Sequence, residues 1–248
     1  MYNPFSIKDK TIFITGASSG IGRATAIECS KMEARVIITG RNQKRLEDTF
    51  LKLHGNDHLA ITADLTIQEE LDNLISSLPK LDGVVCNAGK IEKKPIQFID
   101  KESFESILDI NTIVPVMMTH QLVKLKKMNN PSSIVYTSSI AGVYTSSIGN
   151  SMYSTSKGAL NAFMKNAALD LAKKGIRCNC VNPGLTDTNL LNDANFTENQ
   201  ILDFKSKYPL KRVGMPDDIA HSIIFLISDA SGWITGTALK IDGGFTLQ

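Results

Sequence analysis

The sequence has few of the features that mark specialised classes of protein. Its 248 residues include four cysteines, four histidines and one tryptophan. No stretch approaches the roughly 18 uncharged apolar residues of a membrane span, and the first residues lack the basic start and apolar run of a secretory signal. The formal net charge is +2 without a concentrated basic face, which excludes the usual electrostatic signature of nucleic-acid binding. We therefore expect a cytoplasmic protein that binds neither membrane nor nucleic acid.

The cysteines and histidines are too scattered to indicate a disulfide scaffold or a metal site. The one close pair of histidines, His54 and His58, encloses a Gly-Asn-Asp sequence typical of a turn, so we expect no metal. The cysteines lack both C-x-x-C spacing and the density of small secreted domains. We expect four buried free thiols: Cys29, Cys86, Cys178 and Cys180.

Short apolar runs rich in β-branched residues alternate with helical patterns along the whole chain. This alternation predicts a parallel, doubly wound α/β sheet with helices on both faces and right-handed crossovers. No linker, internal repeat or low-complexity tract interrupts it, so we expect a single domain over residues 1–248. The seven expected strands are 11–15, 35–39, 58–62, 81–86, 133–137, 176–181 and 238–241.

A glycine-rich loop joins the first expected strand to the first expected helix. Gly16, Gly20 and Gly22 lie between the strand and a helical pattern over 23–32. Glycines in this context let backbone N–H groups approach a pyrophosphate, and the helix N-terminus adds partial positive charge. A tight turn can also need glycine for conformational reasons alone. The loop therefore indicates a dinucleotide site without establishing one.

The end of the second expected strand favours a phosphorylated dinucleotide. In a dinucleotide-binding fold this position, about 20 residues beyond the glycines, meets the adenosine ribose. A carboxylate there would bind the ribose 2′-hydroxyl of NAD, but the sequence has Gly40-Arg41. Because arginine can pair bidentately with a 2′-phosphate, we expect NADP(H) to be preferred over NAD(H). The alternative is that Arg41 merely begins a solvated helix over 42–53.

One expected helix carries a tyrosine and a lysine on its apolar face. At 100° per residue, an arc of about 80° holds both of them. Such a face packs on a sheet, where a polar group is costly unless it is paired. A lysine in this position usually extends to solvent, so the helix alone leaves both roles open. The residues of this face are Tyr153, Lys157, Leu160, Met164, Ala167 and Leu171.

Polar and small residues follow three other expected strands. Asn87-Ala88-Gly89 follows the fourth, Ser138-Ser139 the fifth and Pro183-Gly184 the sixth. The carboxyl ends of parallel strands meet along one crevice, which is where open α/β sheets bind ligands. Serines at strand ends can also serve only to complete turns.

Two irregular segments complete the pattern. A long helix expected from about 100 to 127 carries Asn111 and contains Pro115, which should kink it or leave a backbone gap. An asparagine beside a kink can be purely structural. The polar segment 189–215 is the longest irregular piece, and we expect it to form a substrate lid.

Together these motifs resemble those of the short-chain dehydrogenase/reductase family over essentially the whole chain. One difference is visible, because the segment from Ser139 to Tyr153 is one residue longer than is common in the family. Ser139 keeps its Ser-x-x-Gly relation to Gly142, so it remains the expected site serine, with Ser138 as its substitute. The residues that carry the resemblance are Thr15 to Gly22, Asn87 to Gly89, Asn111, Ser139, Tyr153, Lys157, Pro183 and Gly184.

The resemblance implies a Rossmann-type fold and the NADP-dependent interconversion of a carbonyl and a secondary alcohol. Tyr153 would supply the proton, and Lys157 would favour its ionised form, since an unperturbed tyrosine titrates near 10. Ser139 would hold the substrate oxygen, and Asn111 would anchor a water that relays protons to Lys157. The implied cofactor-binding residues are Gly16, Ser18, Ser19, Gly20, Ile21, Gly22, Arg41, Asp64, Leu65, Asn87, Ala88, Gly89, Tyr153, Lys157, Pro183, Gly184, Thr186 and Thr188.

Within the family, the pattern is most similar to 3-oxoacyl-acyl-carrier-protein reductases. This implies an acidic carrier protein as partner, held by basic residues for which Lys174 and the run 124–127 are candidates; helix-end charges are their alternative interpretation. Sugar, polyol and steroid dehydrogenases share the motifs. A non-catalytic NADP-sensing protein is a further alternative, although such proteins usually lack the tyrosine or the lysine. The resemblance also implies a homodimer or homotetramer, built through the helices of Asn111 and Tyr153 and the last strand.

Overall fold

Seven parallel strands form one sheet in a computed structural model of the chain, which describes residues 2–188 and 205–247. The order is β3-β2-β1-β4-β5-β6-β7, so the winding direction reverses between β1 and β4. Ligands of such sheets bind at that reversal, beyond the carboxyl ends of the strands. The strands are β1 (Thr11–Thr15), β2 (Arg35–Gly40), β3 (Leu59–Thr62), β4 (Leu81–Cys86), β5 (Met128–Thr137), β6 (Ile176–Pro183) and β7 (Ala238–Ile241).

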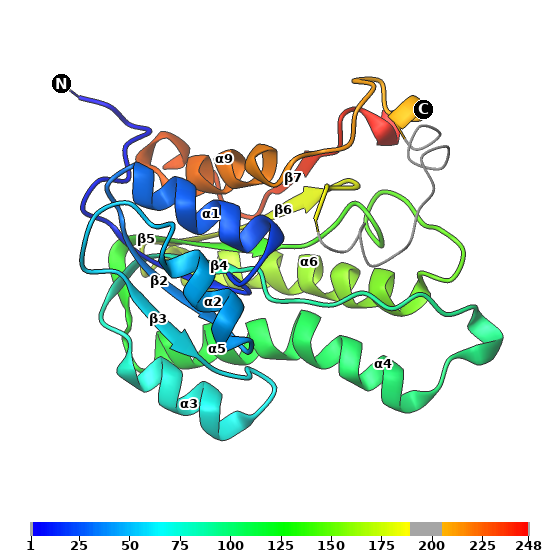
Figure 1. Ribbon diagram of the computed structural model, residues 1–248, viewed down its shortest axis with the longest axis horizontal. Helices are drawn as coiled ribbons and strands as arrows, with labels where there is room; N and C mark the ends of the chain where they lie inside the picture. The colour runs from blue at the N-terminus through cyan, green and yellow to red at the C-terminus, as the bar shows by residue number, and fades with distance from the viewer. Residues whose placement is uncertain (1, 189–204, 248) are drawn as a thin grey trace.

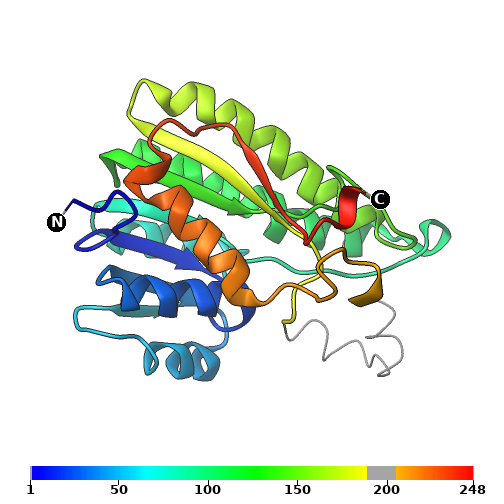
Figure 2. The same ribbon diagram turned by 90° about the horizontal axis from the view of Figure 1, so that it is seen from above.

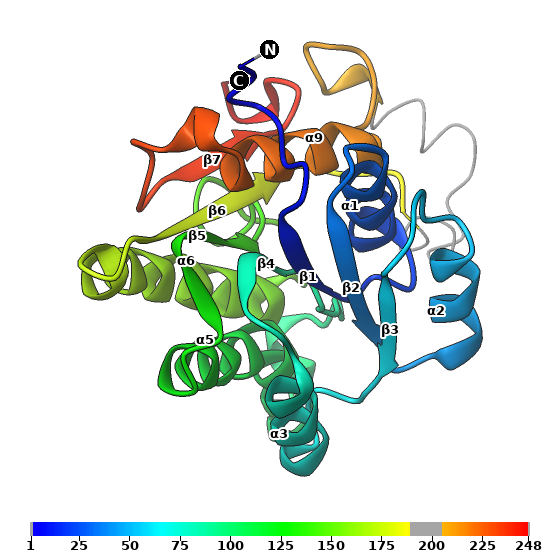
Figure 3. The ribbon, with the colours of Figure 1, turned by 90° about the vertical axis from the view of Figure 1, so that its left-hand side faces the viewer.

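Helices cover both faces of the sheet (Figure 1 and Figure 3). One face carries α1 (Gly20–Lys31), α2 (Gln43–Phe50) and α9 (Pro216–Ile227). The other carries α3 (Gln68–Ser77), α5 (Val114–Lys124) and α6 (Ser151–Ala172), and α4 (Lys101–Leu108) leads into α5. Short 3₁₀ turns are formed by Ile96–Phe98, Asp229–Ser231 and Phe245–Leu247.

Each face of the sheet has its own apolar core. In β1, Ile12 and Ile14 point into the core under α1 and α9, whereas Phe13 points into the core under α3, α5 and α6. Successive residues of a strand face opposite sides, so a strand covered on both faces is apolar throughout. This explains the continuous apolar runs of the sequence and confirms the predicted fold class.

The long helix expected over 100–127 is interrupted. Residues Asp109–Ile113 form a π-helical turn between α4 and α5. Pro115 lacks an N–H and cannot donate to the carbonyl of Asn111 four residues earlier, which disfavours an unbroken α-helix at this point. The break predicted from Pro115 is therefore present, and it contains Asn111. Wide turns of this kind occur often at functional sites.

The expected lid is described only in part, since 189–204 lie outside the described residues. Its remaining part lies beside the C-terminal segment (Figure 2). The ring centroids of Tyr208 and Phe245 are 5.1 Å apart, and the Leu210 N–H donates to the Gly243 carbonyl at 3.3 Å. This part is thus anchored to the chain's own C-terminal residues.

The cysteines are buried free thiols, as expected. No helix in the described part of the chain has the length and apolar character to cross a bilayer. Across residues 2–188 and 205–247, no three histidine, cysteine or acidic side chains are grouped so that they could hold a metal ion.

Candidate active site

The glycine loop brings the ends of β1 and β4 into close contact. Gly16 has a φ of +65°, and a Cβ on it would lie 2.8 Å from the Cα of Ala88. A Cβ on Gly22 would overlap the Gly16 carbonyl oxygen. Asn87 closes the turn by donating from Nδ2 to the carbonyls of Thr15 (3.2 Å) and Gly16 (3.3 Å). These contacts require glycine and explain the spacing of the motif.

The loop presents the N-terminus of α1 to the crevice. Ser19 is the N-cap residue, but its side chain makes no capping hydrogen bond to the first-turn N–H groups. Ile21 packs against the core behind the loop. A glycine cradle ahead of an uncapped helix fits a pyrophosphate.

Arg41 is exposed beside this loop at the end of β2. A Cβ on the neighbouring Gly40 would lie 3.4 Å from the hydroxyl oxygen of Ser18, so Ser18 adjoins the same corner. The Asp64 carboxylate accepts hydrogen bonds from the Thr66 hydroxyl (2.7 Å) and N–H (3.0 Å), which lower the pKa of Asp64, with a smaller contribution from Arg41. Leu65 is buried in the core.

Lys157 is buried on the sheet-facing side of α6, one turn after Tyr153. Only 4% of Lys157 is exposed. Its Nζ donates to the Thr137 carbonyl at 2.8 Å and lies 5.8 Å from the centroid of the Tyr153 ring. A Cβ on Gly89 would lie 3.4 Å from this Nζ. The lysine therefore points into the crevice, and the alternative of a solvent-directed lysine is wrong.

Burial changes the acid–base properties of both side chains. It lowers the pKa of Lys157 to about 8, because the ammonium loses hydration. Burial also raises the pKa of Tyr153, and a side-chain hydrogen bond with Ser139 opposes this shift without outweighing it. The pKa of Tyr153 is therefore shifted upward in the chain alone, which is opposite to the lowering expected from Lys157. The phenol holds its proton at neutral pH.

Ser139 is brought to Tyr153 by a tight turn after β5. Its Oγ accepts a hydrogen bond from the Ala141 N–H at 3.1 Å. Gly142 has a φ of +79°, and a Cβ on it would overlap the carbonyl of Ser154 at the start of α6. The turn therefore packs directly against the tyrosine's helix despite the additional residue in this segment.

Asn111 has a side chain whose polar atoms are all bonded to the protein. It is 1% exposed, and its Nδ2 donates to the Lys90 carbonyl (2.9 Å) and the Ser156 hydroxyl (3.0 Å). Its Oδ1 accepts from the Lys90 N–H at 2.9 Å. The side chain thus ties the segment after β4 to α6, which the sequence did not indicate.

The end of β6 closes the crevice opposite the glycine loop. The Gly184 N–H donates to the Ile241 carbonyl at 3.0 Å, next to Pro183. The Thr186 hydroxyl donates to the Gly184 carbonyl at 3.1 Å. A Cβ on Gly20 would lie 3.1 Å from the Thr188 side chain. Thr186 and Thr188 therefore flank the space in front of the loop.

A buried polar network behind the site was missed by sequence reasoning. The Asn182 Nδ2 donates to the Ser139 carbonyl at 2.6 Å and to Asn161 Oδ1 at 3.3 Å. Asn161 also donates to the Ser138 hydroxyl, and Ser138 and Asn161 both donate to the Lys157 carbonyl. The network fixes the backbone of Ser139 to that of Lys157. The signal in the sequence was that Asn161 and Asn182 lie within otherwise apolar stretches.

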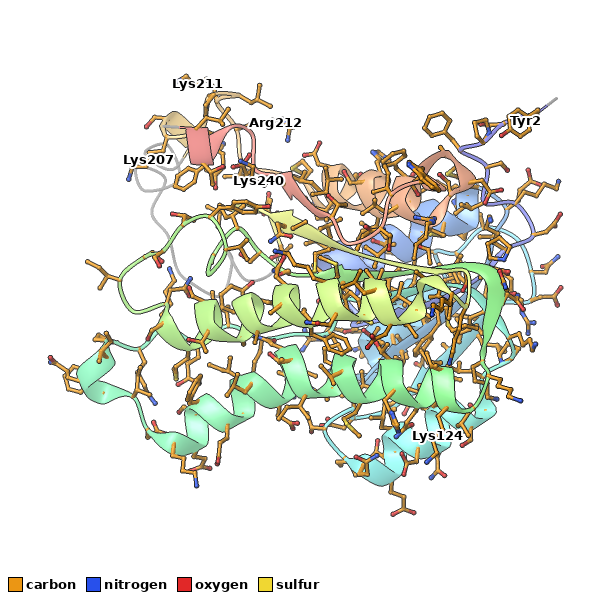
Figure 4. The ribbon with its side chains drawn as sticks, turned by 180° about the vertical axis from the view of Figure 1, so that it is seen from behind. Tyr2, Lys124, Lys207, Lys211, Arg212 and Lys240 are labelled. Atoms are coloured by element: carbon orange, nitrogen blue, oxygen red, sulfur yellow. The ribbon has the colours of Figure 1, made fainter. Side chains whose placement is uncertain are left out.

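The basic residues considered for a carrier protein lie at the opposite edge of the sheet. Lys124, Lys126 and Lys174 line a hollow of about 440 Å³ where β5 and β6 begin, and Figure 4 shows Lys124 far from the other labelled lysines. Lys124 lies in the last turn of α5, as the helix-end interpretation predicts. The Lys127 ammonium instead donates to the carbonyls of Ser76 (2.7 Å) and Leu78 (2.5 Å) at the end of α3. Within one chain these residues are not near Tyr153.

Comparison with known proteins agrees with this geometry. A family model described as enoyl-(acyl carrier protein) reductase matches residues 16–246. The chain belongs to the short-chain dehydrogenase/reductase family. This short-chain dehydrogenase/reductase is 35% identical over 238 residues to the 3-oxoacyl-[acyl-carrier-protein] reductase FabG of Rickettsia felis, covering 96% of the chain and 97% of the relative. It is 32% identical over 248 residues to the glucose 1-dehydrogenase of Gluconobacter oxydans, covering 96% and 92%.

Solved structures of the family have the same fold. The RhlG/NADP active-site complex of Pseudomonas aeruginosa superimposes with a TM-score of 0.92 at 26% identity, covering 99% of this chain and 100% of that one. The protein is therefore an oxidoreductase of the short-chain dehydrogenase/reductase family.

Proposed function

We propose that the protein is an NADPH-dependent carbonyl reductase with Tyr153 as proton donor, and that its substrate is a 3-oxoacyl thioester on an acyl carrier protein. The observation that carries the proposal is the buried, crevice-facing Lys157 beside Tyr153 and Ser139. Among the described residues no carboxylate is paired with Lys157, and burial of such a lysine is costly unless a ligand uses its charge.

The residues around the crevice fit a phosphorylated dinucleotide. Bound NADPH would supply the hydride for the carbonyl carbon. The glycine loop and the N-terminus of α1 would hold its pyrophosphate, and Arg41 with Ser18 its 2′-phosphate. Thr186 and Thr188 would bond the carboxamide, and Lys157 the nicotinamide ribose. The RhlG complex and the FabG relatives support NADP(H).

The chain's own side chains would handle the proton. The raised pKa of Tyr153 keeps its phenol protonated, which is the form that donates to the oxygen of the reduced carbonyl. The Ser139 hydroxyl would hold that oxygen beside Tyr153. The Lys157 ammonium would then stabilise the phenolate left behind. A water on the Asn111 main-chain carbonyl, which Pro115 cannot bond, would return the proton, since the Asn111 side chain has other partners.

The FabG relatives support an acyl substrate, and the glucose dehydrogenase relative keeps a sugar as the second candidate. The non-catalytic alternative is disfavoured because both Tyr153 and Lys157 are present. The proposed carrier protein would bind to an oligomer of this chain. Because α6 has 22 residues and is roughly 33 Å long, antiparallel pairing of α6 with its copy would bring Lys174 of the partner subunit towards Tyr153.

A panel of 3-oxoacyl thioesters, aldoses and steroid ketones, assayed with NADPH and NADH, tests this function. We expect thioester turnover with NADPH, and kcat/KM lower by at least about tenfold with NADH, because Arg41 has no 2′-phosphate to bind. Arg41→Asp should reverse or abolish this preference. Lys44→Asp, a charge reversal on the exposed face of α2, is the matched control and should leave it unchanged. Equal kinetics with both cofactors in the wild type would contradict the interpretation of Arg41.

A further inference from the structure

Two asparagines outside the sequence motifs meet inside the protein, where the ends of β5 and β6 adjoin α6. Asn182 precedes the last residue of β6 and is 0% exposed, and Asn161 lies one helical turn after Lys157 on α6 and is 5% exposed. Figure 3 shows α6 alongside β5 and β6. The Asn182 Nδ2 donates to the Asn161 Oδ1 at 3.3 Å. The two amides therefore join the end of a strand to the helix that carries Tyr153 and Lys157.

Main-chain hydrogen bonds hold the turn after β5 along the end of β6. The Ser138 N–H donates to the Val181 carbonyl at 2.9 Å, and the Ile140 N–H donates to the Pro183 carbonyl at 3.1 Å. Pro183 has no N–H, so its main chain cannot donate to the turn in return. The residue between Ser138 and Ile140, which is the expected site serine, therefore depends on another donor.

The Asn182 side chain supplies this donor. Its Nδ2 donates to the Ser139 carbonyl at 2.6 Å. The Ser139 Oγ accepts from the Ala141 N–H at 3.1 Å, so β6 holds the carbonyl of this serine and its own turn holds the hydroxyl. A hydroxyl oxygen that accepts from an N–H keeps its proton for a further partner. A side-chain hydrogen bond joins Ser139 to Tyr153.

The Asn161 side chain continues the connection to Lys157. Its Nδ2 donates to the Lys157 carbonyl at 2.9 Å and to the Ser138 hydroxyl. The Ser138 hydroxyl donates to the same carbonyl at 3.0 Å. The Lys157 ammonium donates to the Thr137 carbonyl at 2.8 Å. The end of β5 is thus tied to both the main chain and the side chain of Lys157.

The Asn182 amide is a costly side chain for a buried strand end. Its Oδ1 is buried, and it has no hydrogen-bond partner within residues 2–188 and 205–247. A buried polar atom without a partner destabilises a fold, whereas an apolar side chain of similar size carries no such cost. The two hydrogen bonds made by Nδ2 are what this amide contributes in return.

We propose that Asn182 is a positioning residue for the reaction, which holds the Ser139 hydroxyl at Tyr153, and that Asn161 holds Asn182 against α6. The inference rests on the proposed carbonyl reduction, in which Ser139 orients the substrate oxygen. Asn182 acts through the main chain of Ser139 and is assigned no contact with substrate. A displacement of about 1 Å in a group that orients a substrate can lower a rate by about 100-fold, so a hydrogen bond behind the site can affect turnover.

Asn182→Ala removes the donor and can be assayed with NADPH and acetoacetyl-CoA, a 3-oxoacyl thioester. We expect kcat to fall about tenfold and the Kd of NADPH to stay within about twofold, because the glycine loop and Arg41 are unchanged. Ser133→Ala is the matched control, since it removes a buried hydrogen bond from β5 to the Leu226 carbonyl. It should keep kcat within about twofold of the wild type.

Asn161→Ala is the second variant and serves if Asn182→Ala does not fold. It leaves the bond from Asn182 to Ser139 in place, so we expect a smaller loss of kcat, about threefold. Urea unfolding of each variant reports whether it is folded.

A double-mutant cycle with Ser139→Ala separates positioning from a purely structural role. If Asn182 acts through Ser139, adding Asn182→Ala to the Ser139→Ala protein should change kcat by less than about twofold. A structural role would lower kcat by the same factor in both backgrounds. That result, or an unchanged kcat in Asn182→Ala alone, would overturn the proposal.

Hydrogen exchange of the turn amides separates this proposal from the proposed function, because it needs no turnover. In Asn182→Ala the Ile140 and Ala141 N–H groups should exchange at least about fivefold faster, with no change in Ser133→Ala. Faster exchange, without turnover of any carbonyl by the wild type, would refute the reductase and leave the anchoring of Ser139 by Asn182 standing. Turnover by the wild type, with equal exchange and equal kcat in Asn182→Ala, would refute the positioning role alone.

Discussion

At the scale of single residues, the environment of Lys157 is the most informative feature. Its ammonium is taken out of water, and the structure supplies one carbonyl in place of the lost hydration. Burial of this ammonium lowers the free energy of unfolding of the cofactor-free protein. It is understandable if the remaining donors are used by a ligand, because a residue placed for binding can cost stability.

We predict that Lys157→Met stabilises the cofactor-free protein at neutral pH. Below about pH 8 the lysine is charged in both states, so the folded state bears the full cost of burial, on the order of 3 kcal/mol for a pKa lowered from 10.5 to about 8. Between pH 8 and 10.5 only the unfolded state keeps the proton, and this cost disappears. The excess unfolding free energy of the variant should therefore be largest below pH 8 and shrink as the pH rises.

Urea unfolding at pH 7, 9 and 10.5 measures this difference. Lys165→Met, an exposed position on the same helix, is the control and should show no such pH dependence. A Lys157→Met protein that is less stable than the wild type at pH 7, or whose difference does not change with pH, would contradict the role of burial.

Single residues also show which parts of the site could be predicted from the sequence. The placement of Tyr153, Lys157 and Ser139 beside one another followed from local motifs, the Tyr-x-x-x-Lys spacing and the Ser-x-x-Gly turn. The roles of Asn161 and Asn182 were not, because they depend on contacts between α6 and β6 that no local pattern encodes. The partners of the Asn111 side chain were not predictable for the same reason, since Lys90 and Ser156 are distant from it in sequence.

At the scale of elements, the inner strands were predicted closely because burial on both faces makes them apolar throughout, although the edge strand β3 is largely exposed. The start of β5 was missed, because the residues before Ser133 are mostly polar and the strand begins at Met128. The break in the long helix followed from Pro115, but its form as a π-helical turn did not. That turn matters because it presents Asn111 to the site.

The basic residues at helix ends did not indicate where a carrier protein would bind. The Lys127 ammonium donates to the carbonyls at the end of α3. This lysine of the basic run therefore has a structural partner within the chain. Lys174 is separated from Tyr153 by nearly the whole of α6. Within one chain, Lys174 therefore does not lie at the crevice.

At the scale of the whole molecule, the proposed self-association would cover apolar side chains that are exposed in the single chain. Leu169 on α6 is 77% exposed, and Trp233 ahead of the edge strand β7 is fully exposed. Leu169 lies on one of the helices through which the proposed oligomer is built. Apolar side chains of this size are usually covered when they belong to an interface.

We predict that Leu169→Glu weakens the oligomer by burying a charge at the proposed α6 contact. Size-exclusion chromatography with light scattering should show the wild type as a dimer or tetramer and the variant as a smaller species. Leu51→Glu, at an equally exposed position beyond α2, is the control and should keep the wild-type mass. An unchanged mass for Leu169→Glu, or a monomeric wild type, would contradict pairing through α6.

In the proposed reaction, Tyr153 gives a proton to a carbonyl reduced by NADPH. Tyr153→Phe removes the hydroxyl and keeps the ring, so the crevice should remain intact. The decisive measurement is the rate of substrate-dependent NADPH oxidation by this variant, with NADPH affinity measured on the same sample. We expect turnover below a few per cent of wild type, about a 100-fold loss, with NADPH binding close to normal. Turnover near the wild-type rate would contradict the account.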